Sequence, residues 1–450
     1  MMSLAEAAAV LGAGMRGGDV RFSGVSTDTR TLRRGDLFVA LRGERFDGHG
    51  FLQNAATAKA AATVVDSRYA GDLPLPAAVV DDTRLALGAL ARHWRARFHP
   101  ALIAVAGSNG KTTVKEMLAA ILRAHGGDEA VLATAGNLNN DIGVPLMLLR
   151  MRQTHRWCAI ELGMNHKGEI AYLADIARPS VALVNNAQRE HLEFMNSIEE
   201  VAAENAAVYA SLPADGIAVV NADDPHAQFF RSRAGARRVV DFGLDAPAQV
   251  TARHAVGPLS SELSLRTPQG EAQATLSIPG LHNVRNALAA AAAAHAAGIE
   301  AKTIGEGLAL FRPYMGRLQV KQARGGATLI DDTYNANPDS VRAAIDVLAS
   351  CPAPRVLVLG DMGEVGAQGA EFHREVGAYA RAKGIASLLA LGEATRDAVQ
   401  AFGPGARHFG SVDELVAQVS GSSILVKGSR FMRMERVVAA LTGAPPEGGH

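Results

Sequence analysis

Short apolar runs and longer helical stretches alternate along the middle of this chain. Between about residue 100 and residue 312, runs such as 157–161 and 180–185 are apolar at nearly every position, and the stretches between them carry apolar residues at helical spacing. Apolar runs of about four to eight residues fit parallel strands that are buried on both faces, and the longer stretches fit the connecting helices. The pattern therefore predicts a largely parallel α/β sheet.

The same alternation returns in the last third of the chain. Helical stretches separate the apolar runs 327–330, 355–360, 387–390 and 423–427, and polar residues follow three of these runs. Because the carboxyl ends of parallel strands meet at one edge of a sheet, these polar residues are expected to face one cleft. We predict a second parallel α/β domain here, with a Rossmann-like architecture.

The first 82 residues have a different pattern, in which short strands are mixed with two short helices. Leucines at helical spacing between residues 82 and 98 predict a helix that links this region to the rest. We therefore predict three α/β domains: a small N-terminal domain over 1–82, a central domain over 83–312 that includes the linking helix, and a C-terminal domain over 313–450.

A glycine-rich turn joins the apolar run 103–106 to a helical stretch that begins at Lys111. Gly107 and Gly110 can adopt backbone angles that other residues avoid, so that N–H groups point at a polyphosphate while the helix start adds partial positive charge. Lys111 adds a full charge, and the Thr112 hydroxyl can hold Mg²⁺ against the outer phosphates. The alternative is a tight turn with a chance lysine. The predicted phosphate loop comprises Gly107, Ser108, Asn109, Gly110, Lys111, Thr112 and Thr113.

Two polar residues follow apolar runs in the central region. Glu161 ends the run 157–161, where an unpaired buried carboxylate is costly without a cation, so we expect it to bind Mg²⁺. The alternative is an acid at the edge of the core. His191 lies just beyond the run 180–185 and can hold a metal or orient a phosphate, although a lone histidine is more often structural.

Loops rich in turn-forming residues offer further polar groups. The segments 25–30, 46–50 and 134–145 combine hydroxyl, amide or charged side chains, and the last two of them also contain glycine. Such segments form surface turns and solvated connections, and they also form ligand-binding loops. The segment 280–287 opens an alanine-rich helix, and its amides can cap that helix or read an adenine edge.

Composition excludes some classes of partner. The 450 residues include 45 Lys plus Arg and 45 Asp plus Glu, so no net charge attracts nucleic acid or an anionic membrane. Cys158 and Cys351 are the only cysteines, too few for a disulfide framework or a cysteine metal site, which fits a reducing cytoplasm. We expect neither a signal peptide nor a membrane span, because the first residues lack a basic region and the alanine run is interrupted.

Four motifs resemble those of one enzyme family. The run Gly-Ser-Asn-Gly-Lys-Thr-Thr at 107–113, with two residues between its glycines, resembles the compact phosphate loop of the Mur ligase and folylpolyglutamate synthase superfamily. The segments 137–145, 334–340 and 360–364 resemble those of the Mur ligases whose acceptor is D-alanyl-D-alanine. The motifs Asp-Tyr-Ala-His and Asp-Asn-Pro-Arg of the ligases that add the third residue are absent. The resemblance covers nearly the whole chain.

The resemblance implies an ATP-dependent amide ligase of peptidoglycan synthesis. Its expected substrates are ATP with Mg²⁺, a UDP-N-acetylmuramoyl tripeptide held by the N-terminal domain, and D-alanyl-D-alanine. We expect an acyl-phosphate intermediate, a cytoplasmic location and a monomer. The alternatives are a third-residue-adding ligase, a folylpolyglutamate-type ligase and a catalytically silent nucleotide-binding scaffold.

The resemblance also assigns roles to individual residues. It assigns catalysis to Lys111, His191 and Arg317, and metal binding to Thr112, Glu161 and His191. It assigns the nucleotide to the phosphate loop together with Asn283, Asp332 and Asn335. It assigns the other substrates to Ser26, Thr27, Arg30, Asp47, His49, Asn137, Asn139, Asn140 and Asn337.

One position departs from the family. Fourteen residues after the motif histidine, Mur ligases often carry a lysine that reacts with CO₂ to form a carbamate ligand for a second Mg²⁺, and here that position is Asn205. An amide is not nucleophilic enough to be carbamylated. We expect Asn205 to offer a neutral carbonyl oxygen in place of the carbamate, and we expect activity without bicarbonate.

Overall fold

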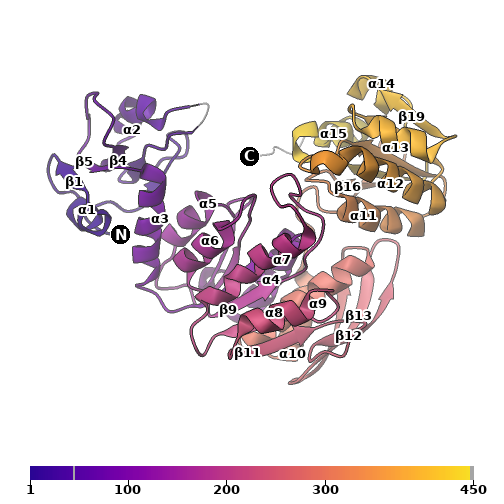
Figure 1. Cartoon of the computed structure of the whole chain (residues 1–450), viewed down its shortest axis with the longest axis horizontal. Coiled ribbons are helices and arrows are strands. Elements are labelled where there is room, and N and C mark those ends of the chain that lie inside the picture. The colour runs from indigo at the N-terminus through magenta and orange to yellow at the C-terminus, as the bar shows by residue number, and fades with distance from the viewer. Residues whose placement is uncertain (44–45, 446–450) are drawn as a thin grey trace.

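Three α/β units follow one another along an open arc in this computed structural model, which describes residues 1–43 and 46–445 (Figure 1). The predicted three-domain α/β fold is confirmed. The boundaries at residues 82 and 312 stay predictions, and residues 446–450 of the predicted C-terminal domain lie outside the described residues. Within the described ranges, no helix has the length and apolar character needed to cross a membrane.

The N-terminal unit is built on a five-stranded sheet in the order β1-β5-β4-β3-β2, in which only β1 runs antiparallel to its neighbour. Its strands are β1 (Gly14–Arg16), β2 (Val25–Ser26), β3 (Leu37–Val39), β4 (Ala62–Asp66) and β5 (Ala77–Val80). Its helices are α1 (Leu4–Leu11), the 3-10 helix η1 (Gly48–Phe51) and α2 (Leu52–Thr57).

The predicted linking helix is α3 (Thr83–Arg95). It begins after Asp82, whose carboxylate accepts hydrogen bonds from the backbone N–H groups of Arg84 and Leu85. It packs against α1 of the N-terminal unit and against α5 and α6 of the central unit. The N-terminal unit is therefore joined to the centre by packing as well as by the chain.

The central unit has a six-stranded, fully parallel sheet in the order β11-β10-β9-β6-β8-β7. Its strands are β6 (Ala101–Ala106), β7 (Val131–Ala133), β8 (Trp157–Glu161), β9 (Val181–Val184), β10 (Ile217–Asn221) and β11 (Arg238–Phe242). Its helices include α4 (Lys111–Gly126), α5 (Gly143–Leu149), α6 (Glu169–Ala177), α7 (Ile198–Ala206), α8 (Ala227–Ala234), α9 (Leu281–Ala296) and α10 (Ala301–Leu310). The strands at 157–161 and 180–185 lie where the apolar pattern predicted them.

A second, antiparallel sheet in the central unit was not predicted. Strands β12 (Thr251–Val256), β13 (Ser261–Thr267) and β14 (Gly270–Leu276) pair in sequence order. Buried and exposed positions alternate along β13, because one face of this sheet packs inward while the other faces solvent. A search for fully apolar runs misses such strands.

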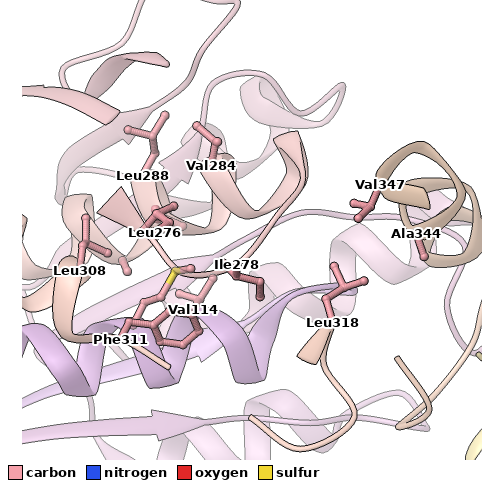
Figure 2. Close-up of a cluster of buried hydrophobic side chains, with 14 of the residues drawn as sticks. Val114, Leu276, Ile278, Val284, Leu288, Leu308, Phe311, Leu318, Ala344 and Val347 are labelled. Atoms are coloured by element: carbon pink, nitrogen blue, oxygen red, sulfur yellow. The ribbon is translucent and has the colours of Figure 1, made fainter. Parts of the chain in front are cut away.

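Helix α9 lies in the core between the two central sheets, because it contacts β9, β10 and β11 as well as β12 and β13. Its alanines from Ala287 to Ala294 are fully buried, and their small side chains allow close approach on several sides. The apolar cluster around this helix includes Ile278 of the central unit and extends to Leu318 and Val347 of the C-terminal unit (Figure 2).

The C-terminal unit is a six-stranded sheet in the order β15-β16-β20-β17-β18-β19, parallel except for β15. Its strands are β15 (Gln319–Gln322), β16 (Thr328–Asp332), β17 (Arg355–Gly360), β18 (Ser387–Leu391), β19 (Ala406–Phe409) and β20 (Ser423–Lys427). Its helices are α11 (Pro338–Ser350), α12 (Gly369–Ala382), α13 (Thr395–Phe402), α14 (Val412–Val416) and α15 (Glu435–Thr442). All four predicted strands are present.

Candidate active site

The glycine-rich turn between β6 and α4 has the backbone shape that the sequence predicted. Gly107 and Gly110 have φ angles of 126° and 82°. A Cβ atom on Gly110 would lie 2.3 Å from Asn286 Oδ1, and one on Gly107 would lie 2.9 Å from the backbone nitrogen of Asn185. Both positions therefore require glycine. No side chain caps the start of α4, so its first N–H groups are available to an anion.

Lys111 is folded back onto the phosphate loop. Its Nζ donates hydrogen bonds to the carbonyl oxygens of Gly107, at 2.6 Å, and Ser108, at 2.8 Å, and it lies 3.1 Å from Glu190 Oε1. Burial alone would raise the pKa of the Glu190 carboxyl, but the charge of Lys111 and a hydrogen bond with His191 outweigh burial and lower it. The lysine charge is therefore held at the mouth of the loop by a carboxylate.

A chain of asparagine amides braces the other side of the loop. The backbone N–H of Asn109 donates to Asn186 Oδ1 at 2.8 Å, and Asn185 Nδ2 donates to the backbone oxygen of Asn109 at 2.7 Å. Asn185 Nδ2 also donates to Asn286 Oδ1, which leads to Asn283 at the start of α9. These bonds tie the loop to the C-terminal end of β9 and to the start of α9.

Glu161 ends β8 beside Thr112, as the sequence predicted. Its Oε1 accepts a hydrogen bond from Asn139 Nδ2 at 2.8 Å and lies 3.3 Å from Thr112 Oγ1, whereas its buried Oε2 has no hydrogen-bond partner among the described residues. A free buried carboxylate oxygen beside a hydroxyl fits Mg²⁺, which takes few protein ligands and keeps water or phosphate oxygens. Across residues 1–43 and 46–445, no cluster of three or more His, Cys, Asp or Glu side chains is arranged as a metal site.

His191 lies between two carboxylates. Its Nδ1 is 2.6 Å from Glu364 Oε2 of the C-terminal unit, and its Nε2 is 3.5 Å from Glu190 Oε1. Burial alone would lower the pKa of His191, but the two nearby carboxylates outweigh burial and raise the pKa to about 9. A charged imidazole at this position would face the phosphates of a nucleotide, and the expected role of His191 as a metal ligand stays a prediction.

A cavity of about 570 Å³ opens beside the phosphate loop between the central and C-terminal units. Arg317 bridges the two units, because its Nη2 lies 3.2 Å from Thr112 Oγ1 and its guanidinium lies 4.0 Å from the ring centre of Tyr334. Asp332 Oδ2 accepts a hydrogen bond from Lys427 Nζ at 2.5 Å. The predicted residues that line the cavity are Asn109, Gly110, Thr113, Asn283, Arg317 and Asp332.

The candidate residues of the N-terminal unit lie apart from this cavity, whose lining residues all follow position 108. Arg30 is exposed and forms a forked ion pair with Asp28, and Ser26 Oγ bonds the backbone of the same turn. Thr27 is partly buried between them.

The other two candidates in the N-terminal unit, Asp47 and His49, are bonded to each other and to nearby backbone groups. The ring of His49 is buried, with Nδ1 at 2.5 Å from Asp47 Oδ1 and with Nε2 accepting a hydrogen bond from the backbone N–H of Asp66 at 3.0 Å. Asp47 also caps η1. Both nitrogens of His49 are therefore engaged inside the N-terminal unit, where they fix the loop.

The remaining amides have separate roles. Asn139 holds Glu161, and Asn140 Oδ1 accepts hydrogen bonds at the start of α5, whereas Asn137 lines a different cavity of about 350 Å³ beside Tyr314. Asn337 caps α11 and donates to Asn109 Oδ1 at 2.8 Å. Asn335 Oδ1 accepts a hydrogen bond from the backbone N–H of the next residue at 2.8 Å.

Asn205 lies on α7 beneath the phosphate loop. Its Oδ1 accepts a hydrogen bond from the backbone N–H of Gly107 at 2.7 Å, and its Nδ2 donates to the backbone oxygen of Val201 at 3.0 Å. The carbonyl oxygen that we expected to face a metal therefore supports the loop.

Several residues of this site were missed from the sequence. Asn185 and Asn186 directly follow β9, Lys427 ends β20, and Gln188 accepts a hydrogen bond from Asn109 Nδ2 at 2.6 Å. The available signal was position, because polar residues at the carboxyl ends of parallel strands face the ligand edge. The same rule that predicted Glu161 therefore also applies to these side chains.

Comparison with known proteins covers all three units. Residues 21–95 match the Mur ligase family catalytic domain, residues 105–294 match the Mur ligase middle domain, and residues 316–430 match the Mur ligase glutamate ligase domain. The UDP-N-acetylmuramoyl-tripeptide–D-alanyl-D-alanine ligase of Escherichia coli strain K12 is 42% identical over 449 residues, which cover 98% of each chain.

Solved structures agree with these sequence matches. A crystal structure of MurF from Acinetobacter baumannii has a TM-score of 0.90 and 34% identity over 98% of both chains. The MurF ligase of Thermotoga maritima in complex with ADP has a TM-score of 0.82 and 25% identity, and the match covers 94% of this chain and 97% of that one. The similarity therefore extends along the whole chain.

Proposed function

Because the chain belongs to the Mur ligase family, we propose that it is an ATP-dependent amide ligase that adds D-alanyl-D-alanine to a UDP-N-acetylmuramoyl tripeptide. The products are the pentapeptide precursor of peptidoglycan, ADP and phosphate. The observation that carries this proposal is the match to a ligase of that name across 98% of both chains. The reaction takes place in the cytoplasm.

The chemistry addresses the poor reactivity of a carboxylate toward an amine. The γ-phosphate of ATP moves to the terminal carboxylate of the tripeptide, which gives an acyl phosphate and ADP. The free amine of D-alanyl-D-alanine then attacks the acyl carbon, phosphate leaves with the C–O bonding electrons, and the amine gives up a proton. Holding three substrates in one enclosed site removes much of the entropy of encounter and keeps water from the acyl phosphate.

The positively charged side chains stabilise the transferring phosphate. Lys111 is already at the mouth of the phosphate loop, and ATP phosphates replace Glu190 and the loop carbonyls as its partners. His191 carries a second charge nearby, and Arg317 reaches the loop from the C-terminal unit. Such preorganised charges in a partly dehydrated site are a major source of catalysis.

Thr112 and the free Oε2 of Glu161 are the residues that would hold Mg²⁺. The ion supplies charge that offsets the negative charge developing on the phosphate oxygens. The amide of Asn283 and the carboxylate of Asp332, both at the cavity wall, hold the adenine and ribose. Ser26, Thr27 and Arg30 meet the UDP end of the other substrate.

Phosphate release in the presence of ATP tests the proposed reaction. It is measured with UDP-N-acetylmuramoyl tripeptides that end in diaminopimelate or lysine, each with and without D-alanyl-D-alanine. Release that needs both the tripeptide and the dipeptide supports the proposal. Phosphate release with a UDP-N-acetylmuramoyl dipeptide and a single amino acid would instead identify a ligase that adds the third residue. Phosphate release with a folate and glutamate would identify a folylpolyglutamate-type ligase.

A further inference from the structure

An ion-pair cluster joins the central and C-terminal units at one point. Arg189 lies between β9 and α7, whereas Asp339 lies in the first turn of α11 and Glu375 lies on α12. Arg189 Nη2 is 2.6 Å from Asp339 Oδ1, and Nη1 is 2.7 Å from Glu375 Oε2. The backbone N–H of Arg189 also donates to Asp339 Oδ2 at 3.0 Å. One central residue therefore holds two helices of the other unit.

The cluster has more support than an ordinary surface ion pair. The side chains of Arg189, Asp339 and Glu375 are only 20%, 25% and 28% exposed, and the guanidinium lies 5.1 Å from the ring centre of Phe372. Hydrogen bonding to Arg189 lowers the pKa of Glu375. Forked, partly buried arginine–carboxylate pairs are stronger and more directional than exposed pairs, so this cluster can fix an orientation.

The cluster also borders the nucleotide cavity. Arg189 and Asp339 both line it, together with Ile278 and Leu318 of the apolar cluster that crosses between the two units (Figure 2). Asn337, the cap of the same helix α11, bonds Asn109 of the phosphate loop. A shift of α11 would therefore move the cavity wall and a contact of the phosphate loop together.

Although Arg189 lines the cavity, its side-chain nitrogens point at the two carboxylates. Its Nε donates to Asp339 at 3.1 Å, and its two terminal nitrogens donate to the two carboxylates. With its donors engaged in this way, the side chain acts through the helices that it holds.

We propose that Arg189 is a positioning residue that, by gripping Asp339 and Glu375, holds α11 over the phosphate loop and keeps both walls of the nucleotide cavity assembled before ATP binds. This role of Arg189 rests on the nucleotide site of the proposed function. It adds to that function a residue that keeps the nucleotide site assembled. Without Arg189 the C-terminal unit samples other orientations. The apparent affinity for nucleotide then equals the affinity of the assembled cavity multiplied by the fraction of molecules in which the cavity is assembled.

The test uses the full chain and a non-hydrolysable ATP analogue with Mg²⁺, with affinity measured by calorimetry. Arg189→Met keeps an apolar stem over Phe372 and removes the charge, and we expect the Kd to rise by about tenfold. The matched control is Arg374→Met, which removes a 2.8 Å pair with Asp397 inside the C-terminal unit, and its Kd should stay within about twofold of the parent. Small-angle X-ray scattering should give a larger radius of gyration for Arg189→Met alone.

A double-mutant cycle separates positioning from a general loss of stability. With Glu375→Gln added, the two costs should be less than additive, and Arg189→Lys should recover part of the affinity because one carboxylate can still pair. Unchanged or tighter nucleotide binding in Arg189→Met, or fully additive costs, would overturn the proposal. Nucleotide binding is read here without turnover, so a chain with no ligase activity would refute the proposed function and leave this result standing.

Discussion

Lys111 has two alternative sets of partners. One set comprises the carbonyl oxygens of its own loop together with Glu190, and the other comprises the phosphates of ATP. In the structure the first set holds it, with Nζ at 2.6 Å from the oxygen of Gly107. The lysine is thus already oriented, and a nucleotide has only to exchange its partners.

Lys111→Ala should lower turnover by about 10²-fold or more, because a charge aimed at the transferring phosphate is lost from a partly dehydrated site. The change lies on the first residue of α4, and the variant is expected to fold. Steady-state phosphate release checks the prediction, and near-parent turnover in the folded variant would contradict it.

His282, in the first turn of α9, should make the stability of the protein depend on pH. Burial lowers the pKa of its imidazole from 6.5 to about 4. The native state resists protonation, so the stability that this residue contributes is complete above pH 6.5 and is lost as the pH falls toward 4. The Tm of the parent should therefore fall more steeply over this range than the Tm of His282→Gln, as measured by calorimetry. Parallel Tm curves would show that His282 does not titrate on unfolding.

Asn205 accepts the N–H of Gly107, so its loss leaves a buried donor unpaired. Asn205→Ala should lower stability by about 1–3 kcal/mol and weaken ATP binding, whereas Glu199→Ala, at an exposed position on the same helix, should do neither. Chemical denaturation and calorimetry measure the two effects.

Activity should also be independent of bicarbonate, because an amide cannot form a carbamate. The check is turnover in CO₂-depleted buffer with and without added bicarbonate. A requirement for bicarbonate would mean that a carbamate forms on another residue.

Helices α4 and α10 show how closely elements approach in the central core. A Cβ atom on Gly307 of α10 would lie 2.3 Å from the Cα of Ile121 on α4, so the two backbones can approach this closely only because this position is glycine. The phosphate loop leads directly into α4, and the contact with α10 therefore supports the helix that carries the site.

Gly307→Ala should destabilise the chain by about 1–3 kcal/mol, since the added methyl group has backbone in its way. Glu306→Ala is the control on the same helix, because its side chain is 56% exposed and should change stability little. Urea denaturation followed by circular dichroism measures both. Equal stability of the two variants would show that the helices separate at no cost.

The strands that could be predicted from the sequence are those buried on both faces. The run 423–427 became β20 with the predicted bounds, because each of its residues is buried. The strand β12 could not be found this way, since its residues are mostly exposed and its pairing with β13 is what holds it. Its existence depends on a contact between segments and not on a local pattern.

The candidate site likewise has parts that could be predicted from the sequence and parts that could not. The phosphate loop could be predicted because its glycines, lysine and helix start are consecutive. The hydrogen bond between Asn205 and Gly107 joins residues that are 98 positions apart, and the hydrogen bond between Arg189 and Asp339 joins residues that are 150 positions apart. Spacing along the sequence carries no information about such pairs, and only the packing of the three units brings them together.

The separation of the two substrate regions leads to a prediction about the whole molecule. Thr27→Ala combined with Arg30→Ala should weaken binding of the UDP-N-acetylmuramoyl tripeptide by about tenfold, because the proposed function places these two residues at the UDP end of that substrate. Affinity for the ATP analogue should stay within about twofold, since none of the described N-terminal residues lines that cavity. Calorimetry with each ligand measures both, and an equal loss for the two ligands would contradict separate sites.

Both cysteines of the chain are buried, Cys158 in β8 of the central unit and Cys351 at the end of α11 in the C-terminal unit. Burial raises the pKa of the Cys158 thiol to about 12, which keeps it protonated and unreactive. The native protein therefore offers maleimide dyes no accessible thiolate. New cysteines placed at exposed positions such as Ser67 and Arg396 would carry a donor and an acceptor fluorophore on the two outer units, and single-molecule energy transfer could follow the opening of the arc in an otherwise unaltered background.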